Sequence, residues 1–284
     1  MAKTPKKDGM YQDIPFETYL QWDAINASNL KQMKLSPKHV RHSLDSAHKE
    51  TTDMRIGHAV HAALLQPEIY KTQYMEMPKF EGKGSRADKA EWKAEHAGTA
   101  SLNQGELATV NLCVNAVKGD KDAWDMINQP GGYKELSIIW TDKKTGLRCK
   151  GRLDIFTRYK GVPSIIDLKS GREAPTNFWC SGEITTRGYH HSMSWYRDGL
   201  SVLSKNKIHR SAWFIFIEKS QPNDVMAYEL DEDAMEKGSS DMREWLDVYA
   251  DCVKSGEWPG LKNKEYGLVT LRPYGFNTGT KGYE

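Results

Sequence analysis

The spacing of apolar residues changes near residue 130 and divides the chain into a helical first part and a strand-rich second part. In the first part, apolar residues recur every three or four positions, which is the spacing of one helix face. Over residues 52–66 this pattern predicts a helix that ends at Pro67, and its apolar positions are Ile56, Ala59, Val60, Ala63 and Leu64. The same spacing predicts one further helix over residues 101–128.

Shorter elements are expected around these helices. Ser28 is a suitable N-cap for a short helix that continues to about Lys34, and Ser36-Pro37 is a suitable start for another. Residues 78–100 are charged and lack sustained apolar periodicity, so they predict an exposed loop with some helix.

After residue 130, the chain contains short runs that are rich in β-branched and aromatic residues. Residues 133–140 and 147–159 predict the two strands of a hairpin, because the turn-rich run TDKKTG joins them. Residues 164–171 and 210–220 predict buried strands, with a helix at 189–204 between them. A last helix is expected over 232–256, interrupted near Gly238. Helices and strands in this order predict an α/β fold around one mixed sheet.

Composition and charge narrow the class of protein. The chain has 284 residues, of which 38% are hydrophobic and 27% charged, enough for one large globular domain. Its formal charge of +2 is too small to indicate a nucleic-acid partner by itself. No apolar stretch is long enough to span a membrane, and the four scattered cysteines suggest reduced thiols in a cytoplasmic protein. A cluster assembled from these distant cysteines is disfavoured but open.

The candidate chemistry lies in residues 164–171, SIIDLKSG. Side chains alternate across a strand, so Asp167 and Lys169 share one face while Leu168 points into a core. Asp154 ends an earlier apolar run and would approach Asp167 if the two strands are neighbours. Two adjacent carboxylates repel each other, and a divalent cation relieves that repulsion; oxygen ligands favour Mg²⁺. Lys169 would then stabilise charge that develops on an attacked phosphate.

This pattern resembles that of the PD-(D/E)xK nuclease superfamily, with Asp154 followed by Asp167-Leu168-Lys169. The run RIGHAVHAALLQPEIY is similar to the G-x-x-x-H helix of RecB-like and RecE-like nucleases, with Gly57 and His61 at its motif positions. Further RecE-type segments resemble INASNLKQMKLSPKH, KELSIIWTDKKTGLRCKGRLDIF, GYHHSMSWYRDGL and GEWPGL. The resemblance therefore covers about residues 14–261.

The resemblance implies a restriction-endonuclease-like fold, in which helices flank a mixed central sheet and an N-terminal helical part precedes it. The nuclease domain would span residues 14–261, between a flexible N-terminus at 1–13 and a C-terminal tail at 262–284. It implies an Mg²⁺- or Mn²⁺-dependent 5′-to-3′ exonuclease that acts on double-stranded DNA ends. Such an enzyme leaves 3′ overhangs for a single-strand annealing protein, forms a homo-oligomeric ring of three or four chains, and works in the cytoplasm of a bacterial host as a phage or prophage product.

The resemblance also assigns roles to individual residues. His61, Asp154, Asp167 and the Leu168 carbonyl would hold the metal, and Lys169 would act on the phosphate together with the two aspartates. The substrate-binding candidates are Lys150, Arg152, Tyr196 and Ser192, of which Ser192 replaces a motif glutamine. Glu135 and His58 would hold the metal ligands in position without contacting the metal themselves.

Each of these assignments has a simpler alternative. Asp167 and Lys169 alone would read as an ordinary ion pair at the end of a strand. Lys150 and Arg152 could merely balance the carboxylates, Tyr196 could belong to the core, and Glu135 or His58 could be exposed bystanders.

Two other functions remain open from the sequence. The first is a RecB-like nuclease of the CRISPR-adaptation type, which acts on single strands; such enzymes usually carry an iron–sulfur cluster, and the cysteine spacing here argues against one. The second is a DNA-binding module that has lost its metal chemistry, against which the intact Asp154, Asp167 and Lys169 argue.

Overall fold

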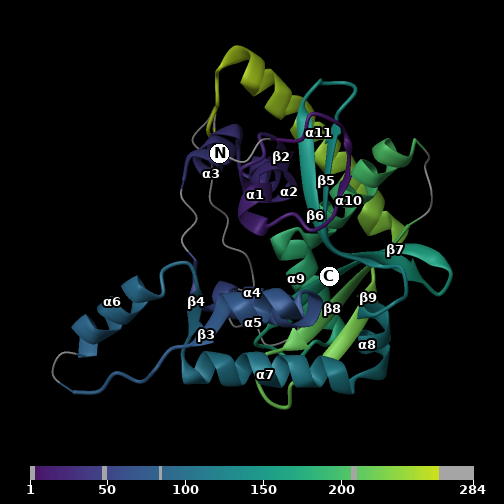
Figure 1. The fold of residues 1–284 in the computed structure, drawn as a ribbon. Helices are drawn as coiled ribbons and strands as arrows, with labels where there is room; N and C mark the ends of the chain where they lie inside the picture. The colour runs from purple at the N-terminus through teal and green to yellow at the C-terminus, as the bar shows by residue number, and fades with distance from the viewer. Residues whose placement is uncertain (1–3, 47–49, 83–84, 206–209, 262–284) are drawn as a thin grey trace, which may run out of the picture.

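The computed structural model describes residues 4–46, 50–82, 85–205 and 210–261, and its centre is a mixed β-sheet (Figure 1). Within these residues the sheet has seven strands in the order β1-β5-β6-β7-β8-β9, with β2 paired to β6. The strands are β1 (Gly9–Tyr11), β2 (Ile25–Asn26), β5 (Tyr133–Thr141), β6 (Arg148–Tyr159), β7 (Val162–Gly171), β8 (Ser211–Glu218) and β9 (Val225–Glu229). The β2–β6 and β7–β8 pairs are parallel, and the others are antiparallel. The predicted mixed sheet and the predicted hairpin of β5 and β6 are both confirmed.

Helices cover both faces of this sheet (Figure 1). One face packs on α4 (Thr52–Leu65), α7 (Gln104–Gly119) and α8 (Lys121–Ile127), and its core includes Ile166, Leu168 and Ile215. The other face packs on four helices and a 3₁₀ turn, with Phe214 and Phe216 at its centre. These elements are α2 (Ala27–Leu30), η1 (Lys31–Lys34), α9 (Asn177–Arg187), α10 (Tyr189–Ser204) and α11 (Glu232–Ser255). The alternation along β7 therefore divides its side chains between two cores.

The remaining elements lie at the edges of these layers. They are α1 (Phe16–Leu20), α3 (Pro37–Asp45), α5 (Pro67–Gln73), β3 (Tyr74–Glu76), α6 (Ser85–Glu95) and β4 (Ala100–Leu102). Strands β3 and β4 form a separate parallel pair, and α6 between them extends away from the body (Figure 1). No helix in the described part of the chain has the length and apolar character needed to cross a bilayer.

Some element boundaries differ from the sequence-based expectation for local reasons. The short helix at residue 27 is capped by Asn26, whose side chain accepts from the Asn29 amide, so Ser28 is not the N-cap. The expected helix over 101–128 is two helices, because the Asp120 side chain accepts from the Ala123 amide and starts α8. The expected helices at 52–66 and 189–204 are confirmed as α4 and α10.

Three other expectations concern the ends of the chain and the linker before α10. Gly9–Tyr11 form β1 against β5, which corrects the expectation of a flexible segment for these residues. Helix α9 was not anticipated in the segment that follows β7. The predicted C-terminal tail, residues 262–284, lies outside the described residues.

Gly238 does not interrupt α11, which continues through it from Glu232 to Ser255. A Cβ atom at this position would collide with Ser194 Oγ and lie 2.9 Å from the carbonyl oxygen of His190. Both of these residues belong to α10. The glycine therefore lets α10 and α11 approach closely, a packing role that the low helix propensity of glycine had concealed.

We expect Gly238→Ala to lower the free energy of unfolding by about 1–3 kcal/mol, because the added methyl group must push α10 away. Gly182, on the exposed side of α9, has nothing within 4 Å of its ideal Cβ position. Gly182→Ala should therefore stabilise the protein by about 0.4–1 kcal/mol. Urea unfolding of both variants checks the pair, and equal changes would contradict the packing role.

Candidate active site

The site forms where β6 and β7 separate. The two strands pair up to Ile155 opposite Ile166 and no further, and the same register places Asp154 opposite Asp167. Just past the last pair, the Leu168 amide donates to Asp154 Oδ2 over 2.8 Å. The Asp154 side chain thus replaces the backbone of β6 as hydrogen-bond partner of β7. Asp154 and Asp167, from neighbouring strands, lie close together as the sequence predicted.

His61 reaches this fork from α4 and makes contacts through both ring nitrogens. Its Nε2 lies 3.0 Å from the Leu168 carbonyl oxygen, and its Nδ1 lies 3.3 Å from Asp154 Oδ2. The structure therefore brings His61, Asp154 and Leu168 together. Both imidazole nitrogens face oxygen atoms that a cation would also use.

Glu135 is closer to the site than expected. It lies on β5 with φ at +53°, in the left-handed region that costs a non-glycine residue strain. Its carboxylate, the His61 imidazole and the Asp154 carboxylate offer ligand atoms that all lie within 4.8 Å of one another. The geometry therefore also allows Glu135 to be a direct ligand, besides the supporting role that the sequence suggested. Pairing the two strands of the hairpin outward from the TDKKTG turn places Glu135 opposite Asp154. The sequence therefore contained enough information to place Glu135 at the site.

Arg152 holds this carboxylate in place. Its Nε donates to Glu135 Oε2 over 2.6 Å, and its Nη1 donates to the Ile14 carbonyl and Ser137 Oγ. Burial raises the pKa of Glu135 and the negative charge of Asp154 adds to this, whereas Arg152 opposes it. Arg152 is buried with these partners, so its position favours orienting Glu135 over binding a phosphate.

Asp167, which is buried, and Lys169, which is half-buried, form an ion pair on one face of β7. Burial raises the pKa of Asp167; Asp154 raises it further, while Lys169 counteracts the rise. Burial alone would lower the pKa of Lys169, but the carboxylates of Asp167 and Asp154 outweigh it and hold that pKa above its usual value. Lys169 is thus a protonated group that can stabilise negative charge, and it is poorly suited to act as a base.

The donor set suits a divalent cation. Carboxyl groups of Glu135 and Asp167 have raised pKa values because they are buried near a third carboxylate, that of Asp154. A hard cation with oxygen ligands would relieve this repulsion. Glu135, Asp154 and Asp167, with His61 and the Leu168 carbonyl, are the groups that would hold it.

Tyr196 reaches the site from α10 across β6. A Cβ at Gly151 would lie 2.8 Å from Tyr196 Cδ1, so the glycine makes room for the ring. Burial raises the pKa of Tyr196 well above its usual value, and the charges of Asp167 and Asp154 contribute. Ser192 is half-buried on the same helix, and no contact among the described residues connects it to the carboxylates.

Lys150 lies apart from the carboxylates, although it shares their strand face. Its Nζ donates to the carbonyl oxygens of Tyr19, Leu20 and Trp22 at 2.8–3.0 Å, at the end of α1. The side chain is buried and its ammonium has these three backbone partners. Its position therefore supports a structural role at the end of α1 in place of the expected phosphate contact.

We expect Lys150→Met to lower the free energy of unfolding by about 2–4 kcal/mol, because three buried carbonyl groups lose their donor. DNA affinity, measured by fluorescence anisotropy below the melting temperature, should stay within about twofold of wild type. Weakened DNA binding with unchanged stability would instead support the phosphate role.

His58 is an exposed residue of α4. Its Nδ1 lies 3.1 Å from Glu50 Oε1, and its ring approaches Phe16 at 6.4 Å between centroids. These contacts correspond to the bystander alternative for His58. No contact among the described residues joins it to His61.

A second group of potential metal ligands consists of His190, His191 and Asp241. His191 Nε2 lies 2.9 Å from Asp241 Oδ2, and Lys237 pairs with the same carboxylate. Burial lowers the pKa of His191 to about 4, with smaller contributions from His190 and Lys31. The nearby positive charges disfavour a cation, so this group is best understood as a polar contact between α10 and α11.

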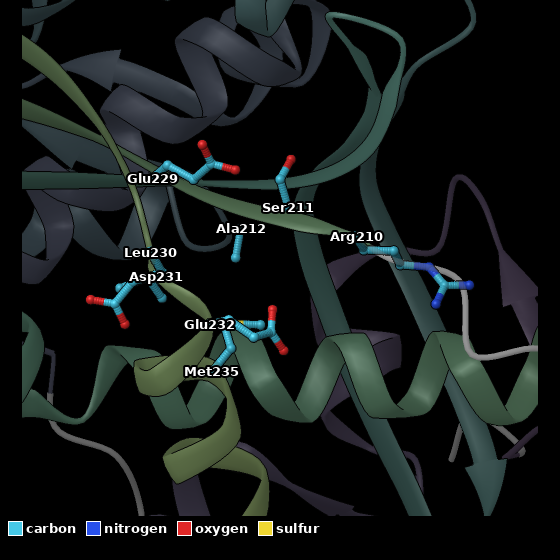
Figure 2. Close-up of a pocket in the computed structure, with 8 residues that line it drawn as sticks. All are labelled: Arg210, Ser211, Ala212, Glu229, Leu230, Asp231, Glu232 and Met235. Carbon is cyan, nitrogen blue, oxygen red and sulfur yellow. The ribbon is translucent and has the colours of Figure 1, made fainter.

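A surface pocket elsewhere on the molecule does not contain the candidate site (Figure 2). It is lined by residues of β8, β9 and the start of α11, including Ser211, Glu229 and Glu232. Figure 2 shows the guanidinium of Arg210 turned away from the Glu232 carboxylate. None of the carboxylates at the fork lines this pocket.

A mixed sheet with helices on both faces, carrying Asp154 and Asp167-Leu168-Lys169 at a strand fork, defines the PD-(D/E)xK class with its restriction-endonuclease-like fold. The chain belongs to the family described as a PDDEXK-like domain of unknown function (DUF3799), whose model matches residues 26–265. Membership in this family, together with the site, supports a nuclease.

Solved structures match this chain at low sequence identity. A protein of Eubacterium rectale described as a "putative exonuclease" shares 14% identity at a TM-score of 0.58, over 95% of this chain and 100% of its own. A protein named SSO0001 shares 14% identity at a TM-score of 0.26, over 80% of this chain and 92% of its own. The search of curated proteins found no match.

Proposed function

We propose that this protein is a metal-dependent exodeoxyribonuclease that digests double-stranded DNA from its ends, 5′ to 3′, and leaves 3′ single-stranded overhangs. The observation that carries the proposal is the strand fork, where Asp154, Glu135 and His61 converge beside the Asp167–Lys169 pair. The family and the described exonuclease of similar fold support a nuclease.

The proposed reaction is hydrolysis of a phosphodiester bond. The oxygen of a water molecule forms a bond to phosphorus, the bond from phosphorus to the leaving 3′ oxygen breaks, and that oxygen gains a proton. A divalent cation, Mg²⁺ or Mn²⁺, when bound by the carboxylates would supply Lewis-acid stabilisation of the phosphate. Lys169 places its ammonium where charge develops on the phosphate oxygens, and Asp167 orients that ammonium. Tyr196, which packs against Gly151 of β6, would contact the substrate from the α10 side.

The biological setting that we propose follows from this activity. The 3′ overhangs would serve a single-strand annealing protein during phage or prophage recombination in a bacterial cell. A ring of three or four chains around the DNA would keep the enzyme attached to its substrate.

The four cysteines bear on the rival single-strand nuclease with an iron–sulfur cluster. Each thiol is buried, and burial raises the pKa of all four. Cys113 belongs to α7 and lies in the core on one side of the sheet, whereas Cys149 and Cys180 lie in the core on the other side. Protonated thiols in separate cores do not form a cluster site, which favours the double-strand enzyme.

Digestion of a linear duplex with Mg²⁺ tests the proposed polarity. Duplexes labelled at the 5′ end should release label in the first turnovers, and duplexes labelled at the 3′ end should release it only after most of the strand is degraded. Faster release from the 3′ label, or preference for single strands, would contradict the proposal.

A further inference from the structure

Lys31 lies beside the candidate active site, although no motif identified it. It begins the 3₁₀ turn η1, and its ammonium is 5.9 Å from the centroid of the Tyr189 ring. The Lys169 ammonium is 4.9 Å from the centroid of the same ring. Two cations from distant parts of the chain therefore approach one aromatic side chain at the start of α10.

The two ammonium groups differ in their counter-charges. Lys169 pairs with Asp167. Among the described residues, no carboxylate lies within ion-pair distance of Lys31, although its side chain is half-buried. A partly buried charge without an opposite charge is costly, and an anionic ligand would offset that cost.

The protein contact that Lys31 does make is weak. Its Nζ donates to the Arg187 carbonyl oxygen at the end of α9 over 3.4 Å. Charge-assisted hydrogen bonds are usually about 2.7–2.9 Å long, so capping α9 does not account for the position of this ammonium. Burial lowers the pKa of Lys31 to about 8; the charge of Lys169 contributes, and Asp167 opposes it. An added anion would relieve both effects.

We propose that Lys31 binds a backbone phosphate of the DNA strand that is being cut, next to the phosphate that Lys169 contacts. Both ammonium groups approach the Tyr189 ring, Lys169 at 4.9 Å and Lys31 at 5.9 Å from its centroid, so the two phosphates would lie close together. Lys31 is a substrate-binding residue in this account, and the proposal rests on the nuclease function proposed above. Its ligand is a phosphate group, either the terminal 5′-phosphate or an internal diester.

Salt dependence of DNA binding tests this contact. Binding of a linear duplex is measured by fluorescence anisotropy with Ca²⁺ in place of Mg²⁺, at several KCl concentrations. We expect Lys31→Ala to weaken binding about tenfold and to reduce the slope of log K against log[salt] by about 1, the change for one lost phosphate contact. Lys31→Arg should retain the wild-type slope. Lys34→Ala, an exposed lysine of the same 3₁₀ turn, should match wild type.

Modified DNA identifies the phosphate. In wild-type protein, one neutral methylphosphonate or a 5′-hydroxyl in place of the 5′-phosphate should reproduce the loss seen with Lys31→Ala. The same modification should have no further effect in Lys31→Ala. Thermal melting of each variant distinguishes a folding defect from a loss of DNA binding. Lys31→Arg keeps the positive charge, so its binding to DNA with one neutral phosphate tests the phosphate contact in a folded chain.

Several outcomes would overturn the inference. A wild-type salt slope in Lys31→Ala, or equal losses in Lys31→Ala and Lys34→Ala, would show that Lys31 holds no phosphate. Lower stability with unchanged affinity would show that it only caps α9. Failure of the wild-type protein to bind or digest DNA would instead refute the nuclease function itself, so the two failures are distinguishable.

Discussion

Asp167→Asn is expected to lower the rate of DNA digestion by roughly 10³-fold or more, to background. The amide has nearly the same shape as the carboxylate, so the fold should persist. It cannot supply the negative charge that holds Lys169 and would help to bind the cation. Single-turnover digestion of a linear duplex measures the loss.

Stability gives this variant a second readout. Burial and the neighbouring Asp154 raise the pKa of Asp167, but the same carboxylate is the ion-pair partner of Lys169 and raises its pKa. The substitution relieves the repulsion between Asp167 and Asp154 but leaves the Lys169 ammonium without its partner, so Asp167→Asn should still melt in one cooperative transition in EDTA while being inactive. Asp224→Asn, an exposed aspartate in the loop between β8 and β9, is the matched control and should keep full activity. Wild-type digestion by Asp167→Asn would remove the basis of the assignment.

Glu135→Gln is expected to raise the Mg²⁺ concentration that half-activates the enzyme by about 10–100-fold. Its carboxylate is one of the three groups whose ligand atoms converge, and an amide oxygen carries no charge for the cation. Titration of digestion rate against Mg²⁺ measures the change. An unchanged requirement for Mg²⁺ would show that Glu135 does not bind the cation directly and only supports the other ligands.

Glu135→Gln should have opposite effects on the melting temperature without metal and on its increase when metal is added. The folded-state pKa of Glu135 is raised by burial and by Asp154, so above its usual pKa the ionised group destabilises the fold, and glutamine removes that cost. We expect a higher melting temperature than wild type in EDTA and a smaller increase on adding Mg²⁺. Glu229→Gln, on the exposed edge strand β9, should change neither quantity.

Much of the fold was accessible from the sequence because its periodicity is strong. The period-two pattern of residues 164–171 correctly divided Asp167 and Lys169 from Leu168, which is fully buried. The helical spacing at 52–66 correctly gave α4 and therefore the element that carries His61. These are local patterns, and local patterns fix which face of an element a side chain occupies.

The features that the sequence did not reveal depend on contacts between distant segments. From the sequence alone, Gly238 is expected to interrupt a helix. The structure shows that the glycine is needed because Ser194 on α10 packs against it. From its strand position alone, Lys150 is a candidate phosphate ligand. In the structure, three carbonyl groups at the end of α1 accept hydrogen bonds from its ammonium. The positive φ of Glu135 and the charge of Lys31 beside Tyr189 likewise follow from tertiary structure, which no local spacing encodes.

Hydrolysis of a linear duplex by the purified protein, with and without a divalent cation, tests the central claim most directly. Acid-soluble nucleotides should appear with Mg²⁺ or Mn²⁺, stop on adding EDTA, and be absent with closed circular DNA, which has no ends. A protein that binds duplex DNA but releases no nucleotides with either cation would contradict the account. Release that continues unchanged in EDTA would contradict it as well.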